Sequence, residues 1–423
     1  MPKPGDQIQV KTKDEIFEGI LIPSSNKKTL ILKLSSGYNI GISNSKIKSI
    51  KKLKTIKRIT PKTKIKQNKS LPSVSLISTG GTIASKIDYN TGAVKWLMEP
   101  HEILSLAPEM SDIVQINKIE SPFAIASENM SYQHWKKIAE TTARLINKDE
   151  AVIITHGTDT LHFTSAALSF MLKNLSKPVI LTYSQRSTDR GSTDTNLNLI
   201  CSSHLAKSNI AEVMLVGHGE SSDTYCLANR GTKVRKCHTS LRSTFRPINE
   251  LPIAKIFPNG SIKILNKKYK KRTDEKVTAD TKFEEKVALI KYYPGASPDI
   301  LDFLTEKKYK GVVIETTGLG HVAVKESKYN WLPSIKKAIN AGLTICAAPQ
   351  TLYGKLNPLV YSPGREISKL GVIYLEDILP ETAYVKLGFV LGHTKDSKEI
   401  KNQMLTNMSN EFNDRLTEDS FLY

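Results

Sequence analysis

The spacing of hydrophobic positions along the chain changes near residue 72. Before it, short segments of alternating apolar and polar residues are separated by turns rich in Pro, Ser, Asn and Gly. Alternation with a period of two is typical of half-buried strands, and several short strands at close spacing favour a small β-barrel. The sequence therefore predicts an N-terminal β-barrel with strands at residues 7–11, 17–22, 30–34 and 38–42.

From residue 72 onwards, continuous apolar runs alternate with stretches of helical length, such as residues 160–172 and 195–206. This alternation is typical of α/β domains that are built on parallel sheets. The apolar runs predict buried strands at residues 74–77, 151–154, 179–181, 213–216, 287–290, 312–314 and 344–347.

A chain of 423 residues is too long for one ordinary core, so we expect several domains. Residues 51–70 are rich in lysine and lack hydrophobic periodicity, which is typical of a linker or an interaction arm. The expected organisation is a barrel at 1–57, a basic linker at 58–71, an N-terminal catalytic α/β domain at 72–275 and a C-terminal α/β domain at 276–423.

Charge is unevenly distributed along the chain. The formal net charge is +20, and residues 1–70 contribute +13 of it, from 17 Lys or Arg against 4 Asp or Glu. A concentrated positive charge favours an anionic partner such as nucleic acid. A lysine-rich solvated surface explains the same numbers, because no basic motif interleaved with aromatic residues supports base recognition. The sequence leaves both explanations open.

Several classes of protein and site are disfavoured. No apolar run reaches the roughly 18 residues that span a bilayer, and no signal-peptide hydrophobic region precedes the barrel, so we expect a cytoplasmic protein.

The cysteines lack Cys-x-x-Cys spacing and the histidines form no paired motif, so we expect no metal and place the cysteines in the core. The four cysteines are Cys201, Cys226, Cys237 and Cys346.

Two glycine-flanked threonines are the strongest candidates for chemistry. Thr82 lies in STGGTI (residues 78–83) and Thr158 in HGTD (residues 156–159), and each follows an apolar run. The carboxyl ends of parallel strands are where such sheets bind ligands, which makes both threonines candidate nucleophiles. The alternative for either motif alone is a strand-to-helix turn with a capping threonine or aspartate.

A nucleophilic threonine needs a base and hydrogen-bond donors for the developing oxyanion. Asp159 follows one threonine directly, and basic residues cluster at Lys233, Arg235 and Lys236. The glycines at 80 and 81 would let the backbone approach a ligand closely. They lack the Gly-Lys-Ser/Thr ending of a P-loop and the third glycine of a dinucleotide fingerprint, so we expect no nucleotide site in this chain.

The two motifs resemble those of the L-asparaginase and glutaminase family, and the resemblance extends over about residues 72–395. Residues 127–130 (SENM) lie where that family binds the amino-acid end of its substrate, and residues 381–387 resemble its C-terminal helix. Lys236 lies where the family places its catalytic lysine. The resemblance implies a two-lobed fold of parallel-sheet domains and a reaction in which a threonine attacks a carboxamide and ammonia leaves.

The resemblance also implies roles for individual residues. Thr82 would be the first nucleophile, and Thr158, Asp159 and Lys236 would move protons and orient the attacking group. Expected substrate-binding residues are Ser127, Glu128, Tyr89 on a mobile lid, and His321, a candidate for the polar group that a neighbouring subunit adds. Which threonine carries the acyl group, and whether glutamine or asparagine is preferred, stays open at this stage.

Within the family, residues 229–236 and the segment before residue 72 most resemble the D subunits of the archaeal glutamyl-tRNA(Gln) amidotransferases. That resemblance implies a partner, the E subunit, which binds Glu-tRNA(Gln) and uses ATP and Mg²⁺ to convert it to Gln-tRNA(Gln). It also implies a central homodimer of D subunits within a heterotetramer, with no cofactor in the D subunit itself.

Two alternatives remain from the sequence alone. One is an independent cytosolic L-asparaginase with a fused barrel, because the site chemistry would be the same. The other is a nucleic-acid-binding or assembly protein on a decayed amidohydrolase, which the charge of the first 70 residues favours. The chemically competent set of Thr82, Thr158, Asp159 and Lys236 argues against the second alternative.

Overall fold

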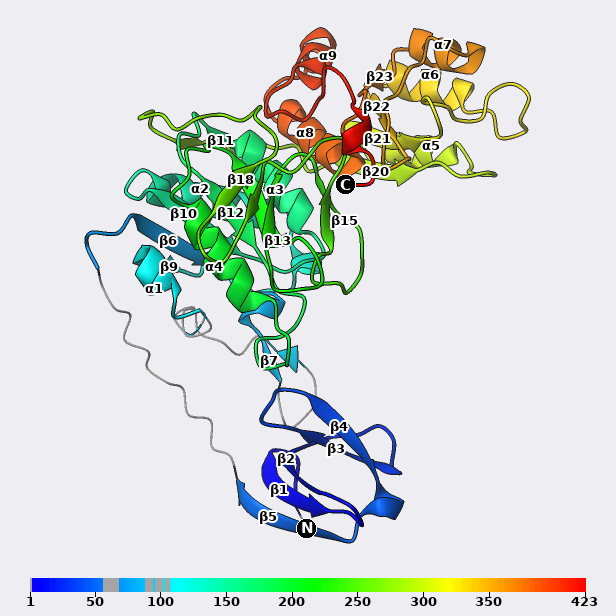
Figure 1. Cartoon of the computed structure of the whole chain (residues 1–423). Coiled ribbons are helices and arrows are strands. Elements are labelled where there is room, and N and C mark those ends of the chain that lie inside the picture. Colours follow the sequence, from blue (N-terminus) through cyan, green and yellow to red (C-terminus); the bar gives the residue numbers. More distant parts are fainter. Residues whose placement is uncertain (1, 56–67, 88–93, 96–101, 103–106) are drawn as a thin grey trace.

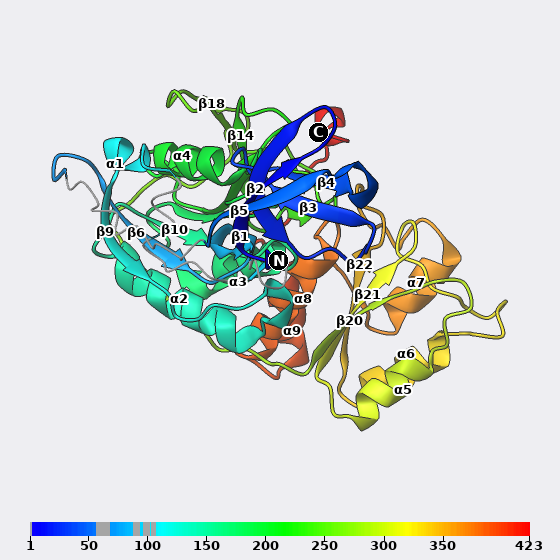
Figure 2. The same cartoon turned by 90° about the horizontal axis from the view of Figure 1, so that it is seen from below.

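A computed structural model describes residues 2–55, 68–87, 94–95, 102 and 107–423. Three units follow one another along the chain: a small sheet at the N-terminus, a large α/β lobe and a smaller α/β lobe (Figure 1). In Figure 2, the N-terminal sheet lies in front of the large lobe. The predicted two-lobed α/β fold with a β domain before it is therefore confirmed.

The N-terminal unit is a five-stranded antiparallel sheet in the order β4-β3-β2-β1-β5, and it curls around a small apolar core. That core contains Ile8, Val10, Leu32 and Ile42, which belong to the alternating segments of the sequence. The strands are β1 (Asp6–Lys11), β2 (Ile16–Ile22), β3 (Thr29–Lys33), β4 (Asn39–Ser43) and β5 (Ser49–Thr55), with a 3-10 turn η1 (Asn44–Lys46).

Strand β5 lies within the predicted barrel bounds of 1–57, but it was not predicted as a strand, because the lysine-rich residues 51–70 were interpreted as a linker or an interaction arm. Strand β5 pairs with β1 along its length, for example Ile50 with Val10 and Lys51 with Gln9. The sequence of β5 lacks the alternation of apolar and polar residues that predicts a strand, because it lies at the edge of the sheet and its residues 51–54 are exposed. Residues 56–67, which include most of the predicted linker at 58–71, lie outside the described residues.

The large lobe is built on an eight-stranded sheet in the order β18-β17-β14-β13-β12-β10-β6-β9. Neighbours from β9 to β13 are parallel, as the apolar runs predicted, whereas β14, β17 and β18 pair in antiparallel fashion and extend one edge. The strands are β6 (Ser73–Ser78), β9 (Gln115–Glu120), β10 (Ala151–Thr155), β12 (Val179–Thr182), β13 (Val213–His218), β14 (Cys226–Arg230), β17 (Ala254–Ile256) and β18 (Ile262–Ile264).

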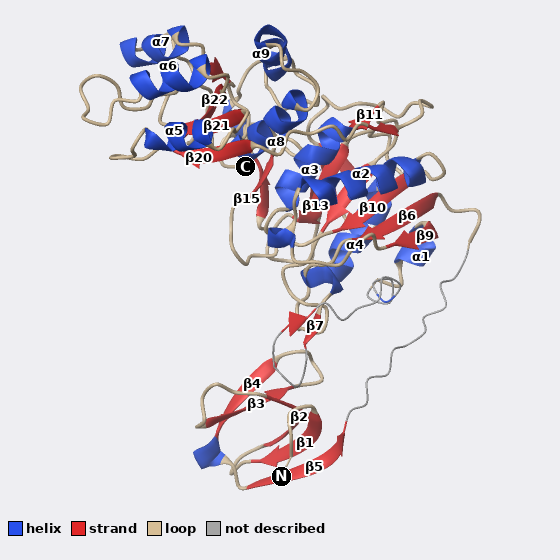
Figure 3. Ribbon diagram, turned by 180° about the vertical axis from the view of Figure 1, so that it is seen from behind, coloured by secondary structure: helices blue, strands red, loops and turns tan. Residues whose placement is uncertain are grey.

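Helices cover both faces of this sheet, which explains why its parallel strands are continuously apolar (Figure 3). Side chains of α1 (Met110–Ile113) and α4 (Thr195–Leu205) pack on one face, with Leu76 and Ile153 of the sheet. On the other face, α2 (Tyr132–Ile146) and α3 (Leu161–Met171) pack on Ile77 and Ile154.

The smaller lobe has a four-stranded parallel sheet in the order β20-β21-β22-β23. Helix α8 (Pro380–Leu391) packs on this sheet through Leu387 and on the core of the large lobe through Phe389, so it joins the two lobes. The other elements are β20 (Val287–Lys291), β21 (Gly311–Thr316), β22 (Thr344–Pro349), β23 (Ile373–Tyr374), α5 (Asp299–Glu306), α6 (Leu332–Asn340), α7 (Ser362–Lys369) and α9 (Ser397–Leu405).

Short elements complete the chain: β7 (Lys86–Ile87), β8 (Val94–Lys95), β11 (Leu172–Lys173), β15 (Val234–Lys236), β16 (Phe245–Pro247), β19 (Thr278–Ala279), η2 (Thr82–Ala84), η4 (Ser127–Asn129) and η5 (Glu418–Ser420). Among the described residues, no helix has the length and apolar character that crossing a membrane requires.

Three cysteines are buried as expected, but Cys237 is exposed beside the tip of the β15–β16 hairpin, so its placement in the core was wrong.

Candidate active site

The two threonine motifs follow neighbouring strands of the large sheet. Strands β6 and β10 are parallel and in register, with Ser78 opposite Thr155, so their carboxyl ends lie side by side. The next residue, Thr79, donates from both its backbone N–H (3.1 Å) and its hydroxyl (2.9 Å) to the carbonyl of Thr155. The loops that carry Thr82 and Thr158 therefore leave the sheet at one place, as the strand ends predicted.

Glycines bring these two loops into backbone contact. Gly81 has a φ of 77°, a conformation that residues with a side chain rarely adopt, and a Cβ there would lie 2.5 Å from the amide nitrogen of Gly157. Gly157 in turn faces Ser127, whose Oγ would lie 3.0 Å from a Cβ at 157. The glycines of the first motif were expected to approach a ligand, and the structure shows them against other loops.

Hydrogen bonds tie the 127–130 segment to the second threonine motif. The backbone N–H of Asp159 donates to Ser127 Oγ over 3.1 Å, and the hydroxyl of Thr160 donates to the Ser127 carbonyl over 2.7 Å. The side chain of Ser127 is thereby buried, with 2% of the residue exposed, whereas its neighbour Glu128 is exposed. The Thr82 loop, the segment 127–130 and the motif 156–159 are distant in the sequence but lie in contact with one another. We call the surface that they form the wall.

Lys236 reaches this wall from the β15–β16 hairpin. Its Nζ lies 2.8 Å from Thr158 Oγ1 and 2.7 Å from Asp159 Oδ1. The lysine side chain is 12% exposed and the Asp159 side chain 62% exposed, while Thr158 is buried. A hydroxyl, an amine and a carboxylate in direct contact can pass a proton from one to the next, and we call these three groups the relay. The carboxylate of Asp159 is exposed, so a bound molecule can contact it.

The other basic residues of the predicted cluster point elsewhere. Lys233 is fully buried and pairs with Asp377 of the smaller lobe (Nζ to Oδ2, 2.6 Å). Arg235 pairs with Glu381 at the start of α8 (2.9 Å). Successive residues of a strand point to opposite faces, which separates the side chain of Arg235 from that of Lys236. Of the three basic side chains that cluster in the sequence, Lys236 contacts the Thr158 motif, whereas Lys233 and Arg235 pair with acidic residues that lie later in the chain.

Burial controls the charge of the groups behind the site. It raises the pKa of the Glu381 carboxyl, and the Arg235 guanidinium opposes that shift. It lowers the pKa of His162 to about 3, assisted by the nearby cations of Arg235 and Lys236. His162 Nε2 lies 3.9 Å from Glu381 Oε1, and because the imidazole is neutral near pH 7 this contact is no ion pair.

Thr82 itself begins the short turn η2 and is partly exposed. Its carbonyl accepts the backbone N–H of Ser85 (3.1 Å) and the Ser85 hydroxyl (2.7 Å), which closes the turn. Ser85 was not predicted from the sequence, because no local signal distinguishes a serine that closes a turn from any other serine near a glycine pair.

The remaining predicted substrate-binding residues are Tyr89 and His321. Tyr89 lies outside the described residues. His321 is in the smaller lobe, in a turn in which its N–H donates to the Thr317 carbonyl (2.9 Å), and its ring packs edge-on against Tyr361 at 5.5 Å. The described residues contain no group of three His, Cys, Asp or Glu side chains that could hold a metal ion.

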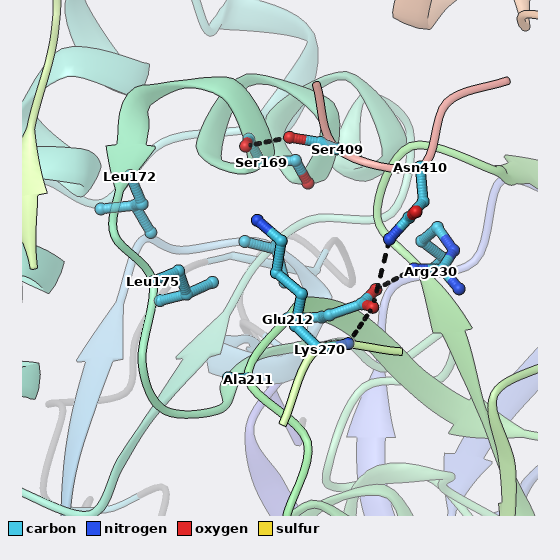
Figure 4. Close-up of a pocket in the computed structure, with 10 residues that line it drawn as sticks. Ser169, Leu172, Leu175, Ala211, Glu212, Arg230, Lys270, Ser409 and Asn410 are labelled. Atoms are coloured by element: carbon cyan, nitrogen blue, oxygen red, sulfur yellow. Dashed lines mark hydrogen bonds and ion pairs between the residues drawn. The ribbon is translucent and has the colours of Figure 1, made fainter. Parts of the chain in front are cut away.

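A separate small cavity lies under the C-terminal segment (Figure 4). Its volume is about 30 Å³, which has room for only one or two water molecules. Glu212 on its wall pairs with Arg230 and accepts from the backbone N–H of Lys270 (3.0 Å) and from Asn410 Nδ2 (3.4 Å). The hydrogen bond from Asn410 to Glu212 attaches the C-terminal segment to the large lobe at this cavity. The cavity is too small for an amino-acid substrate.

Comparisons with protein families match nearly the whole chain. The model of the asparaginase N-terminal domain matches residues 73–270, that of the glutaminase/asparaginase C-terminal domain matches residues 286–404, and that of the GatD N-terminal domain matches residues 2–53.

Individual relatives agree with these matches. The D subunit of the glutamyl-tRNA(Gln) amidotransferase of Thermococcus kodakarensis is 51% identical over 96% of this chain and 92% of its own length. Its counterpart in Pyrococcus abyssi is 50% identical over 99% and 97%. Among solved structures, the thermostable L-asparaginase of T. kodakarensis matches with a TM-score of 0.72 at 26% identity, covering 81% of this chain and all of that one. L-asparaginase I of Vibrio cholerae matches with a TM-score of 0.70 at 26% identity, covering 81% and 99%.

Proposed function

Because this chain belongs to the family of glutamyl-tRNA(Gln) amidotransferase D subunits, we propose that it hydrolyses the side-chain amide of glutamine, or asparagine, and releases ammonia. The observation that carries the proposal is the contact of Lys236 Nζ with both Thr158 Oγ1 and Asp159 Oδ1, beside the loop of a second threonine. Hydrolysis of an amide needs a nucleophile and a route for protons, and this wall offers both.

In the proposed mechanism, the Thr82 hydroxyl attacks the amide carbonyl carbon. The amide nitrogen takes up a proton and leaves as ammonia, and water then cleaves the resulting ester. Thr158, Asp159 and Lys236 form the relay that delivers and accepts these protons and orients the attacking water. Lys236 suits this role because it contacts a hydroxyl on one side and a carboxylate on the other.

The substrate's amino-acid end would bind at the exposed carboxylates of the same wall. Its ammonium needs acidic partners, and Asp159 and Glu128 are both exposed there. Ser127 Oγ accepts one backbone N–H and keeps its own proton, which it would donate to the substrate carboxylate. Tyr89 would act as a lid residue, and His321 as the group that the neighbouring chain of a homodimer contributes.

The released ammonia would serve a second subunit. In the proposed assembly, the partner is the amidating E subunit, which binds Glu-tRNA(Gln), and ATP and Mg²⁺ act at that partner. This chain would form the homodimer at the centre of the complex. The matches to D subunits over 96% and 99% of the chain support this assignment over an independent asparaginase.

Ammonia release by the purified full chain, with its partner present, tests the proposed chemistry. We expect Thr82→Ala and Lys236→Met to lower kcat for glutamine by at least about a hundredfold, because each removes a group that touches the reacting atoms. Comparing glutamine with asparagine measures a one-methylene preference, which is worth only about 1–3 kcal/mol.

Matched substitutions control for general damage. Thr142→Val removes a buried hydroxyl that has no hydrogen-bond partner among the described residues, and Lys268→Met removes an exposed ammonium. Both variants should retain wild-type kcat. Wild-type turnover by Thr82→Ala or by Lys236→Met would refute the assigned roles.

A further inference from the structure

The loop between β12 and α4, residues 185–193, is braced from within, and we call it the bracing loop. The Asp194 carboxylate that follows it accepts the backbone N–H groups of Gln185 (2.9 Å) and Arg186 (3.0 Å). Across the loop, the Thr193 hydroxyl donates to the Arg186 carbonyl (3.1 Å), and Arg186 Nη1 donates to the Gly191 carbonyl (3.4 Å). The ends of the loop are thus held together, as in a compact Ω-loop.

One side of the bracing loop touches the N-terminal sheet. The turn between β3 and β4 carries Gly37 with a φ of 84°, and a Cβ there would lie 2.6 Å from the amide nitrogen of Gly191. A Cβ at Gly191 would lie 2.6 Å from a ring carbon of Tyr38. The hydroxyls of Tyr38 and Ser192 are 2.5 Å apart. The two backbones therefore meet with no space between them for larger side chains.

A buried lysine completes this contact. Lys33 is 5% exposed, and its Nζ donates to the carbonyl of Asp189 in the bracing loop and lies 3.9 Å from the carboxylate of the same residue. Burial lowers the pKa of Lys33, and the Asp189 carboxylate opposes that shift. The contact is therefore buried at Lys33, whereas Tyr38 at its other end is 52% exposed. The N-terminal sheet touches the loop at both places.

The other side of the bracing loop touches the turn that carries Thr82. The Thr188 hydroxyl donates to the carbonyl of Ser85 over 3.2 Å. Ser85 is 1% exposed, and its hydroxyl donates to the carbonyl of Thr82 over 2.7 Å. A continuous path of direct contacts therefore runs from Tyr38 through the bracing loop to the candidate nucleophile.

We propose that Thr188 is a positioning residue for the Thr82 turn, and that the N-terminal sheet holds Thr188 in place by docking on the bracing loop. The proposal rests on the amide-hydrolysing function of Thr82. It gives the N-terminal unit a part in the hydrolysis, because a displaced bracing loop would shift Ser85 and, with it, the hydroxyl that attacks the substrate. A misplacement of about 1 Å can cost about a hundredfold in rate.

Substitutions at Thr188 test the first step of the path, with ammonia release from glutamine measured on the full chain in the presence of its partner. We expect Thr188→Val to lower kcat about tenfold or more and to leave KM within about twofold, since the turn moves while the substrate's binding groups stay. Thr188→Ser keeps the hydroxyl and should restore kcat to within about twofold of wild type. Thr305→Val is the matched control and should retain wild-type kcat, because Thr305 lies in α5 of the smaller lobe and its hydroxyl donates to a carbonyl there, that of Leu301 (2.8 Å).

A double-mutant cycle tests the second step, the docking of the N-terminal sheet. Gly191→Val inserts atoms into the Tyr38 ring, and Tyr38→Phe removes the hydroxyl that meets Ser192. Each should lower kcat in the wild-type background and add little to Thr188→Val, because both act through Thr188. If Gly191→Val fails to fold, as thermal unfolding would reveal, Tyr38→Phe supplies the cycle.

The outcomes separate the two proposals. Wild-type kcat in Thr188→Val, or no recovery in Thr188→Ser, would overturn the positioning role while Thr82→Ala is still inactive. Fully additive losses in the double mutants would overturn the docking step. If Thr82→Ala keeps wild-type turnover, the function itself fails, and the role of Thr188 fails with it.

Discussion

At the scale of single residues, the histidine that begins the second threonine motif holds neighbouring segments together. His156 is fully buried, with Nδ1 2.7 Å from the Gly157 carbonyl and Nε2 2.8 Å from Thr164 Oγ1. The indole N–H of Trp135 donates to the same hydroxyl over 3.1 Å. A neutral ring with its proton on Nδ1 donates to the carbonyl and accepts from the threonine, so it holds Gly157 against Gly81.

The protonation of His156 predicts a pH dependence of stability. Burial lowers its pKa to about 4, against about 6.5 in the unfolded chain. Because the folded pKa is depressed, the stabilisation is complete above pH 6.5 and is lost as the pH falls towards 4. We expect the free energy of unfolding to decrease by about 3 kcal/mol over this window on account of His156.

Urea unfolding at several pH values between 7 and 4.5 measures this decrease. His156→Gln should make the dependence less steep without abolishing it, because the pKa of buried His162 is also lowered, to about 3. A substitution of the exposed His238 by Gln should leave the dependence as in the wild type. Equal slopes for His156→Gln and the wild-type chain would contradict the assignment.

The sequence alone could identify the site residues only where their signal is local. Thr82 and Thr158 are visible in glycine-flanked motifs after apolar runs, and Asp159 is adjacent to one of them. The role of Lys236 came from a family resemblance, because no periodicity relates it to Asp159, 77 positions away. The contact of Thr188 with Ser85 spans 103 positions and depends on where two loops lie in space.

At the scale of elements, the site depends on how closely two loops approach one another. Parallel strands β6 and β10 bring the loops to one edge, and the glycines at 81 and 157 let them touch. The strands were predictable because both faces of a central parallel sheet are buried and their sequences are continuously apolar. The antiparallel additions β14, β17 and β18, and the exposed strand β5, were not, since direction and edge position leave little trace in a short segment.

Adding a methyl group at this contact gives an element-scale prediction. Gly81→Ala places a Cβ 2.5 Å from the Gly157 nitrogen and forces a positive φ on alanine. We expect it to cost about 1–2 kcal/mol from the backbone conformation and about 1–3 kcal/mol more from the clash, with amide hydrolysis lost.

Gly342→Ala provides the control, because Gly342 also has a positive φ of 89° but meets no atom within 4 Å. It should show the backbone cost alone, with normal activity. Urea unfolding and ammonia release on both variants make the comparison, and equal effects on both would show that the loop contact is unimportant.

At the scale of the whole molecule, buried contacts connect the parts that surround the site. Lys233 lies three positions before Lys236 and pairs with Asp377 of the smaller lobe, to which Asn413 of the C-terminal segment also donates (2.8 Å). The N-terminal sheet contacts the large lobe through the bracing loop. The β15–β16 hairpin and the Thr82 turn are therefore held from two opposite ends of the chain.

The amidation of Glu-tRNA(Gln) by the assembled complex, with either glutamine or ammonium as nitrogen donor, tests the central claim most directly. Thr82→Ala should lower the glutamine-dependent rate by at least about a hundredfold and leave the ammonium-dependent rate within about twofold of wild type, because only the release of ammonia uses this chain's threonine. Equal losses with both donors, or no loss with glutamine, would contradict the account.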